Sequence, residues 1–204
     1  MRLVFLGTPA AAVLPLEALV TAGHDVALVV SAADKRRGRG SGLLPSPVKS
    51  AAVALGLPVT ADVDDVLMLS PPAALGVVVA YGRIIKPHLL AALPMVNLHF
   101  SLLPRWRGAA PVERAILAGD ERTGVCVMDV EEGLDTGGVR ARLELPIGID
   151  TTAEELRAEL VARGTTLLVD TLARGLGASD PQVGEPTYAH KIDPTELHID
   201  WSQP

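Results

Sequence analysis

Apolar residues along this chain form short continuous runs that alternate with longer stretches at helical spacing. The short runs predict strands at residues 2–6, 25–31, 76–80, 96–99, 123–130 and 139–145. Helical spacing and helix-boundary residues predict helices at 10–22, at 47–55 and over about 20 residues from Thr152 to near Gly175. Continuously apolar strands alternating with helices are typical of an α/β fold, with a mainly parallel sheet covered on both faces.

Residues at the ends of these segments support the predicted boundaries. Pro47 suits the first position of a helix, and Gly56 follows the last predicted turn of the same helix. Thr152 and Glu155 have the spacing of a capping box, in which each residue satisfies a hydrogen-bonding group of the other. The segment 34–44 is rich in glycine and arginine and is predicted to be a loop.

The predicted topology indicates where a ligand would bind. The carboxyl ends of parallel strands meet at one edge of a sheet, and ligands of α/β proteins bind beyond that edge. The loops that follow Leu6, Ser31, Ala80 and Leu98 are therefore expected to lie together. The last two predicted strands are compatible with a hairpin around residues 131–138.

Composition narrows the class of protein. The 204 residues are 49% hydrophobic and 21% charged, as in a single globular domain, and only 3% are aromatic. The single cysteine, Cys126, lies between Val125 and Val127, which indicates a buried thiol rather than a nucleophile. The chain has no apolar run of about 20 residues and no signal-peptide pattern, so a cytoplasmic protein without a membrane partner is expected.

The segment 96–104 carries the first candidate for catalysis. Asn97 and His99 are two apart on a predicted strand, so their side chains project to the same side. An asparagine amide can stabilise a developing oxyanion, and an imidazole can transfer a proton near neutral pH. The alternative is a hydrogen-bonded structural histidine at a strand end, and the Asn-x-His pattern alone does not separate the two.

A second candidate is Asp135, in the glycine-rich loop 131–138. It could orient an imidazole, or it could be an ordinary turn residue. Gly7 begins no dinucleotide or phosphate-loop fingerprint, and the histidines and Cys126 lack metal-ligand spacing. No metal is therefore expected.

Basic residues gather in the segment 34–42 and close in sequence to the segment 96–104 that carries Asn97. A net charge of −6 argues against a surface broadly built for nucleic acid, but it allows a local cationic site. The positive residues concerned are Lys35, Arg36, Arg37, Arg39, Arg83, Lys86, Arg105 and Arg107. They are either a solvated surface or contacts for an anionic substrate such as a phosphate backbone.

Several of these segments resemble the methionyl-tRNA formyltransferase family. The matching segments, in the order of that family, are residues 7–9, 38–40, 45–49, 77–82, 97–111, 133–137, 188–192 and 199–201. The resemblance covers essentially the whole chain, and the run through Trp106 and Pro111 is its most specific part. It implies a Rossmann-like formyltransferase fold and formyl transfer from 10-formyltetrahydrofolate to initiator methionyl-tRNA.

The resemblance also implies roles for individual residues. Asn97, His99 and Asp135 would be catalytic, and Arg39 would contact the tRNA. The residues that would line the folate site are Ser101, Leu102, Leu103 and Pro104. Residues 1–177 would form the catalytic domain of a monomer, and 178–204 a linker toward a C-terminal tRNA-binding domain that this chain lacks.

The sequence leaves two alternatives to this function open. A formyltransferase could act on a small amine such as an amino sugar, or the protein could bind folate or tRNA without turnover. The run through Trp106 favours the tRNA substrate, and the lack of the second domain favours a small amine. The presence of Asn97, His99 and Asp135 together disfavours a protein without turnover.

Overall fold

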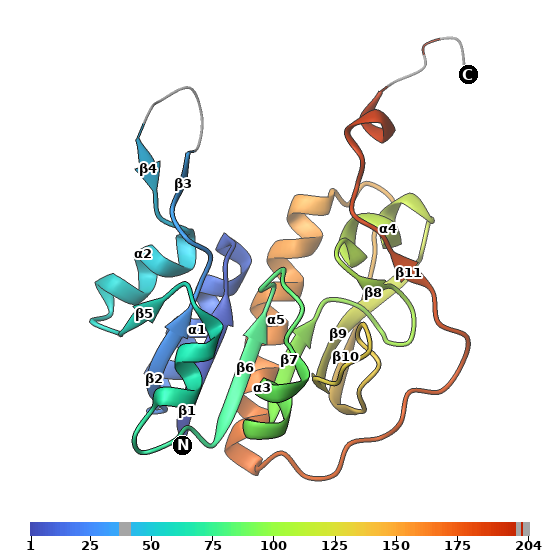
Figure 1. Ribbon diagram of the computed structural model, residues 1–204. Coiled ribbons are helices and arrows are strands. Elements are labelled where there is room, and N and C mark those ends of the chain that lie inside the picture. Colours follow the sequence, from blue (N-terminus) through green and yellow to red (C-terminus); the bar gives the residue numbers. More distant parts are fainter. Residues whose placement is uncertain (37–41, 199–200, 202–204) are drawn as a thin grey trace.

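The computed structural model describes residues 1–36, 42–198 and 201, which fold around one seven-stranded sheet (Figure 1). The strands are β1 (Arg2–Gly7), β2 (Asp25–Val30), β5 (Val59–Thr60), β6 (Leu75–Val79), β7 (Met95–His99), β9 (Arg122–Asp129) and β10 (Val139–Pro146). Their spatial order is β10-β9-β7-β6-β1-β2-β5, parallel from β7 to β5 and antiparallel at the β7–β9 and β9–β10 pairs. The expected mainly parallel α/β sheet and the hairpin around residues 131–138 are confirmed.

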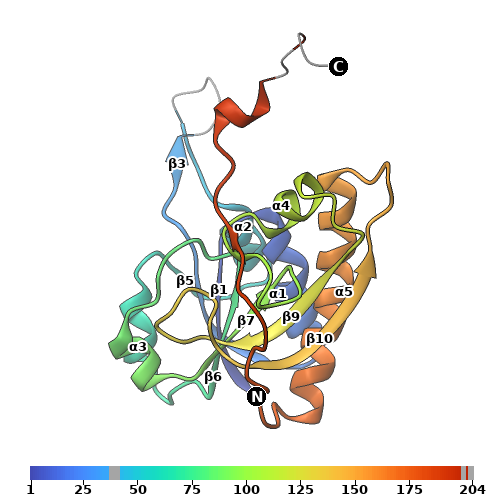
Figure 2. The same ribbon diagram turned by 90° about the vertical axis from the view of Figure 1, so that its right-hand side faces the viewer.

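Helices cover both faces of this sheet, as expected (Figures 1 and 2). The helical segments are η1 (Ala10–Ala12), α1 (Val13–Thr21), α2 (Pro47–Ala54), η2 (Val63–Met68), α3 (Pro87–Ala92), α4 (Pro111–Leu117), α5 (Ala153–Arg174) and η3 (Pro194–Leu197). Helices α1, α2 and α5 pack on one face in the larger apolar cluster, whereas α3 and η2 pack on the other. Both clusters are built mainly from aliphatic side chains, as the low aromatic content requires.

The boundary signals in the sequence act as expected. Pro47 is the first residue of α2, and the Ser46 hydroxyl accepts a hydrogen bond from the Lys49 amide. Thr152 and Glu155 form the reciprocal capping box at the start of α5. This helix ends at Arg174, and its C-cap is Gly175, whose φ of +82° lies in a region that glycine enters without a steric penalty.

The segment 34–44 differs from the expectation that it is only a loop. Two short antiparallel strands, β3 (Lys35–Arg36) and β4 (Leu43–Leu44), pair at its ends. The pairing was missed because two residues per strand carry too little alternation to be detected among glycines and arginines. Helices α3 and α4 were missed as well, since each spans only six or seven residues.

The C-terminal segment runs back along the body of the protein before it projects from it (Figure 1). Its short strand β11 (Tyr188–Ala189) pairs in parallel with β8 (Arg107–Gly108), which follows β7 in the chain. Further along, the Arg114 guanidinium on α4 bonds to the Glu196 carboxylate and to the His190 and Lys191 carbonyls. The hairpin β3–β4 projects from the same edge of the sheet.

We expect Thr152→Ala to lower the free energy of unfolding by about 1 kcal/mol, because it removes the cap of the longest described helix. Chemical denaturation with the two-state midpoint and slope measures this change. Thr166→Ala is the control, since Thr166 lies in the middle of α5 and caps nothing. An equal effect of both variants would contradict the role of the cap.

Candidate active site

Asn97 and His99 lie on the same face of β7, near the carboxyl ends of the parallel strands. The neighbouring residues Val96 and Leu98 point into the larger apolar cluster on the other face. The alternation expected for a strand is therefore present, and His99 is 5% exposed. The rim predicted from the sequence also exists, because β1, β2, β6 and β7 run in parallel and end at one edge.

A backbone carbonyl fixes which nitrogen of His99 carries a hydrogen. His99 Nε2 lies 2.9 Å from the carbonyl oxygen of Trp106. A carbonyl oxygen can only accept a hydrogen bond, so Nε2 donates. In the neutral ring Nδ1 is then the unprotonated nitrogen, free to accept a proton.

Asp135 faces this free nitrogen from the loop between β9 and β10. Its Oδ2 lies 3.7 Å from His99 Nδ1 and accepts a 2.8 Å hydrogen bond from the Gly108 amide. The separation from Nδ1 is longer than a hydrogen bond but short enough for the carboxylate to attract an imidazolium. The structure thus brings together Asn97, His99 and Asp135, which lie up to 38 residues apart in the chain.

Several bonds hold the Trp106 carbonyl in place. Trp106 has a φ of +62°, which is uncommon outside glycine. Its amide donates to the Thr187 hydroxyl at 2.9 Å, and its indole nitrogen donates to Asp120 at 2.7 Å. The Arg105 guanidinium also bonds to Asp120 and lies 4.5 Å from the centre of the Trp106 ring.

The same contacts act on the Asp120 carboxyl. Hydrogen bonds from Arg105, and secondly from Trp106, hold the pKa of Asp120 below its usual value, against the opposing effect of burial.

The Asn97 carboxamide is uncommitted. It is half-buried, and it makes no side-chain hydrogen bond within the part of the chain that the structure describes. An amide in that condition can donate to a substrate oxygen without first breaking an internal bond.

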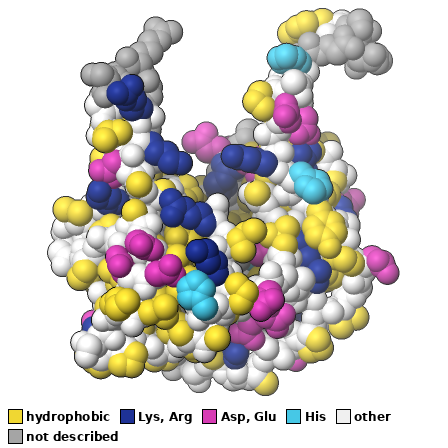
Figure 3. Space-filling view, viewed as in Figure 1, with side chains coloured by type: hydrophobic (Ala, Val, Ile, Leu, Met, Phe, Trp, Pro, Cys, Tyr) yellow, Lys and Arg dark blue, Asp and Glu magenta, His cyan; other side chains and the backbone are white. Residues whose placement is uncertain are grey.

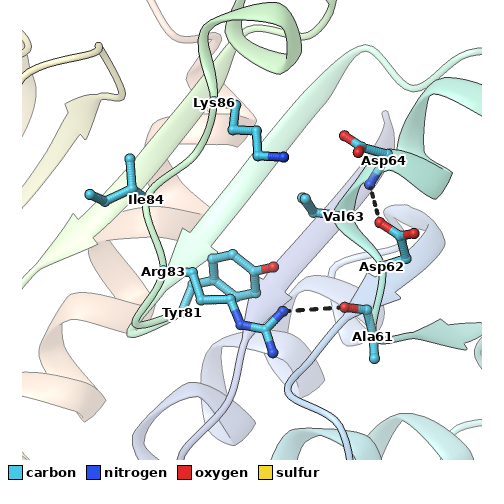
Figure 4. Close-up of a pocket in the computed structure, with 8 residues that line it drawn as sticks. All are labelled: Ala61, Asp62, Val63, Asp64, Tyr81, Arg83, Ile84 and Lys86. Atoms are coloured by element: carbon cyan, nitrogen blue, oxygen red, sulfur yellow. Dashed lines mark hydrogen bonds between the residues drawn. The ribbon is translucent and has the colours of Figure 1, made fainter.

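A pocket of about 470 Å³ lies between the segments that follow β5 and β6 (Figure 4). The lining residues are Ala61, Asp62, Val63, Asp64, Tyr81, Arg83, Ile84 and Lys86. The Arg83 guanidinium donates to the Ala61 carbonyl across it, and Ile84 is 87% exposed. The Tyr81 hydroxyl is buried without a described hydrogen-bond partner, and burial raises the pKa of Tyr81.

The residues expected to line a folate site lie on the β9 side of His99. The Ser101 hydroxyl is fully buried and donates to the Arg105 carbonyl at 2.6 Å. Leu103 packs with Cys126 and Met128, while Leu102 and Pro104 are partly exposed. Leu103 also lines a smaller cavity of about 220 Å³ beneath residues 180–183.

Basic side chains gather between the two projecting segments, on the face shown in Figure 3. Lys35 and Arg36 lie on β3, and Lys49 on α2 forms an ion pair with Asp34. Arg39, the residue expected to contact tRNA, lies outside the described residues.

Some residues of this site gave no functional signal of their own in the sequence. Trp106 supplies a carbonyl, Thr187 a hydroxyl and Gln182 an amide, the last two from the C-terminal segment. Trp106 could have been suspected from the run that resembles a known family, but a backbone acceptor leaves no mark in the residue type. Cys126 is buried as expected, and burial raises the pKa of its thiol.

The described residues form neither a metal-ligand cluster nor a membrane-crossing helix. Within the described parts of the chain, no three His, Cys, Asp or Glu side chains come together as metal ligands would. Over the same residues, no helix has the length and apolarity that crossing a membrane requires.

The chain is similar to known formyl-transferring proteins. A family model described as formyl transferase matches residues 1–172. A methionyl-tRNA formyltransferase of Roseobacter denitrificans is 50% identical over 100% of this chain and 70% of its own length. Among solved structures, a phosphoribosylglycinamide formyltransferase of Bacillus halodurans is 26% identical, with a TM-score of 0.72 over 85% of this chain and 94% of its own.

A third similarity concerns the fold alone. An N-formyltransferase of Helicobacter canadensis, solved with folinic acid and dTDP-3-aminofucose, has a TM-score of 0.73 at 22% identity. The alignment covers 95% of this chain and 75% of that one. With the family model matched over most of its length, the chain belongs to the formyl transferase family.

Proposed function

We propose that this chain transfers the formyl group of 10-formyltetrahydrofolate to the α-amino group of methionine on initiator tRNA, a step of translation initiation in the cytoplasm. The observation that carries the proposal is the 50% identity, over the whole chain, to the Roseobacter denitrificans methionyl-tRNA formyltransferase. The arrangement of Asn97, His99 and Asp135 supports the chemistry.

The described residues fit a folate co-substrate. The pocket of about 470 Å³ is within the size range of small-molecule sites, about 300–1,000 Å³. Its partnerless Tyr81 hydroxyl suits a polar group of a ligand, and Arg83 and Lys86 suit carboxylates. We propose that the folate lies across this pocket and reaches Asn97, with Ser101, Leu102, Leu103 and Pro104 forming the wall on the β9 side.

The co-substrate supplies the formyl group and the nitrogen that leaves. As the amine adds to the formyl carbon, the formyl oxygen gains negative charge, and the Asn97 carboxamide is proposed to donate a hydrogen bond to it. The amine nitrogen must also lose a proton. His99 Nδ1 is suited to accept it, because Nε2 is committed to the Trp106 carbonyl.

Asp135 is proposed to stabilise the imidazolium that forms. Its carboxylate is held by the Gly108 amide and lies 3.7 Å from Nδ1. The imidazolium can then give the same proton to the departing folate nitrogen as the carbon–nitrogen bond breaks. Atoms and charge balance, and the enzyme returns to its starting protonation state.

The basic edge of the sheet is proposed to receive the tRNA. Lys35 and Arg36 precede Arg39 closely in the chain, and phosphate contacts made by such residues supply affinity without reading sequence. Residues 1–177 are proposed to be the catalytic domain of a monomer, and residues 178–204 a connecting segment toward a further tRNA-binding region.

We expect His99→Ala to lower kcat about 10²–10⁴-fold and Asn97→Ala about 10²–10³-fold, the usual ranges for a general base and an oxyanion donor. Formyl transfer to charged initiator tRNA measures kcat, and fluorescence titration with a formyl folate measures the retained donor binding. His24→Ala is the control, because His24 lies at the opposite edge of the sheet, just before β2.

Two outcomes would contradict the proposal. Full activity of His99→Ala would remove its catalytic role. A wild-type protein that binds the folate but formylates an amino sugar instead of methionyl-tRNA would point to a small-amine enzyme.

We expect Arg39→Ala to raise the KM for tRNA several-fold and to leave the KM for the folate unchanged. The difference should shrink as salt rises, because a bond between arginine and a phosphate weakens with ionic strength. Arg174→Ala is the matched control, since this 79% exposed side chain lies at the far end of α5. Unchanged use of tRNA by Arg39→Ala would refute the interaction.

A further inference from the structure

We propose that Gln182 is a positioning residue of the formyl-transfer site, acting through Asp135. Gln182 lies on the C-terminal segment and is 83 positions away from His99 in the chain. The inference rests on the proposed function in one respect, namely that Asp135 takes part in the transfer.

The Gln182 carboxamide is fully used. Its Nε2 donates to the carbonyl oxygens of Asp135 and Gly137, each at 2.8 Å. Its Oε1 accepts from Nε and Nη2 of Arg107, at 3.0 and 2.7 Å. A guanidinium only donates, so Arg107 fixes the direction of the amide and turns the NH₂ group toward the loop.

These bonds tie together the two elements that hold the Asp135 carboxylate. The backbone of Asp135 is bound through Gln182 to Arg107, and the carboxylate accepts from the amide of Gly108, the next residue along. Gln182 therefore fixes the distance between the loop that carries the carboxylate and the strand that supplies its donor. A shift of either element would change the 3.7 Å separation from His99.

The loop needs such a tie because its own conformation is strained and partly exposed. Asp135 has a φ of +50°, outside the regions that most residues adopt. Its neighbour Leu134 is 58% exposed and offers little packing to hold the turn. Strained backbone persists only where the surroundings determine it, and here two of the surrounding bonds come from Gln182.

Other contacts hold the C-terminal segment in place without Gln182. Asp180 exchanges two backbone hydrogen bonds with Val139, and β11 pairs with β8. Arg114 bonds to Glu196 farther along, and hydrogen bonds from Arg114 lower the pKa of Glu196 to about 2. A variant of Gln182 should therefore leave the segment docked and affect the Asp135 loop selectively.

Two variants of similar size test the proposal. Gln182→Glu keeps an acceptor for Arg107 but replaces the NH₂ group with an oxygen that repels both loop carbonyls. Gln182→Met removes the donors and acceptors without adding charge. Glu185→Gln is the matched control, because Glu185 is exposed and close by on the same segment.

We expect both Gln182 variants to lower kcat about 10–100-fold, since misplacing a catalytic group by about 1 Å can cost as much as 10²-fold. The KM for each substrate should stay within about threefold of wild type. Any decrease in melting temperature should be too small to explain the lower kcat. In an Asp135→Ala background, Gln182→Met should cause no further decrease. The Glu185→Gln control should retain wild-type kcat.

Three results would overturn the proposal. The first is an unchanged kcat in Gln182→Met, including the case in which only Gln182→Glu is impaired, because the added charge would then be the cause. The second is a decrease in kcat that occurs only together with a lower melting temperature or a changed KM, because destabilisation or altered substrate binding would then be the cause. The third is a full additional decrease in the Asp135→Ala background.

A crystal structure of Gln182→Met separates this proposal from the function proposed above. We expect the Asp135 carboxylate to move away from the Gly108 amide and from His99, whatever the acceptor amine is. An unmoved Asp135 loop would refute the positioning role even if the enzyme formylates methionyl-tRNA. If the wild-type protein is inactive on methionyl-tRNA, the proposed substrate is refuted. The crystal structure of Gln182→Met still decides whether Gln182 positions Asp135.

Discussion

The hydrogen bond from His99 Nε2 to the Trp106 carbonyl is the interaction on which the rest of the site depends. It commits one imidazole nitrogen and leaves Nδ1 to face Asp135 and any reacting group. For the carbonyl to point at His99, Trp106 takes a φ of +62°, a conformation that costs a non-glycine residue about 1–3 kcal/mol. The bonds from Trp106 to Thr187 and Asp120 offset that cost, so the hydrogen-bonding state of His99 is fixed by groups outside the proposed catalytic trio.

Contacts between segments that are distant in the chain complete the site. The Trp106 amide meets Thr187, and the Arg107 guanidinium meets Gln182, across 81 and 75 positions. The parallel strand ends supply the edge, but two polar side chains that help to orient His99 and Asp135, those of Thr187 and Gln182, come from the C-terminal segment. This division explains why a polar, proline-containing stretch with little regular structure lies against the sheet. Its backbone and side chains form hydrogen bonds with groups at the edge of the sheet.

Much of the fold could be predicted because its signals are local. Continuous apolar runs marked the strands, and Thr152 with Glu155 marked the start of α5. The position of Asn97 and His99 on one face followed from the alternation of side chains along a strand. The bonds of Gln182 and the carbonyl of Trp106 could not be predicted, because they depend on where distant segments meet and not on a pattern along the chain. The β3–β4 pairing was missed for a different reason, since two-residue strands carry no measurable period.

Backbone strain is concentrated at the edge of the sheet where the parallel strands end. Among the described residues, the non-glycine positions with positive φ are Ala80, Trp106 and Asp135. Ala80 directly follows β6, Trp106 follows β7, and Asp135 lies in the loop that faces His99. Such turns re-aim a peptide group or side chain within one residue, which a relaxed loop could not do in so little chain. They are stable because β6 and β7, from which two of these segments leave, are buried between helices on both faces. The rigidity of the sheet thus allows strained turns at its edge, and two of these turns, at Trp106 and Asp135, place the groups that face His99.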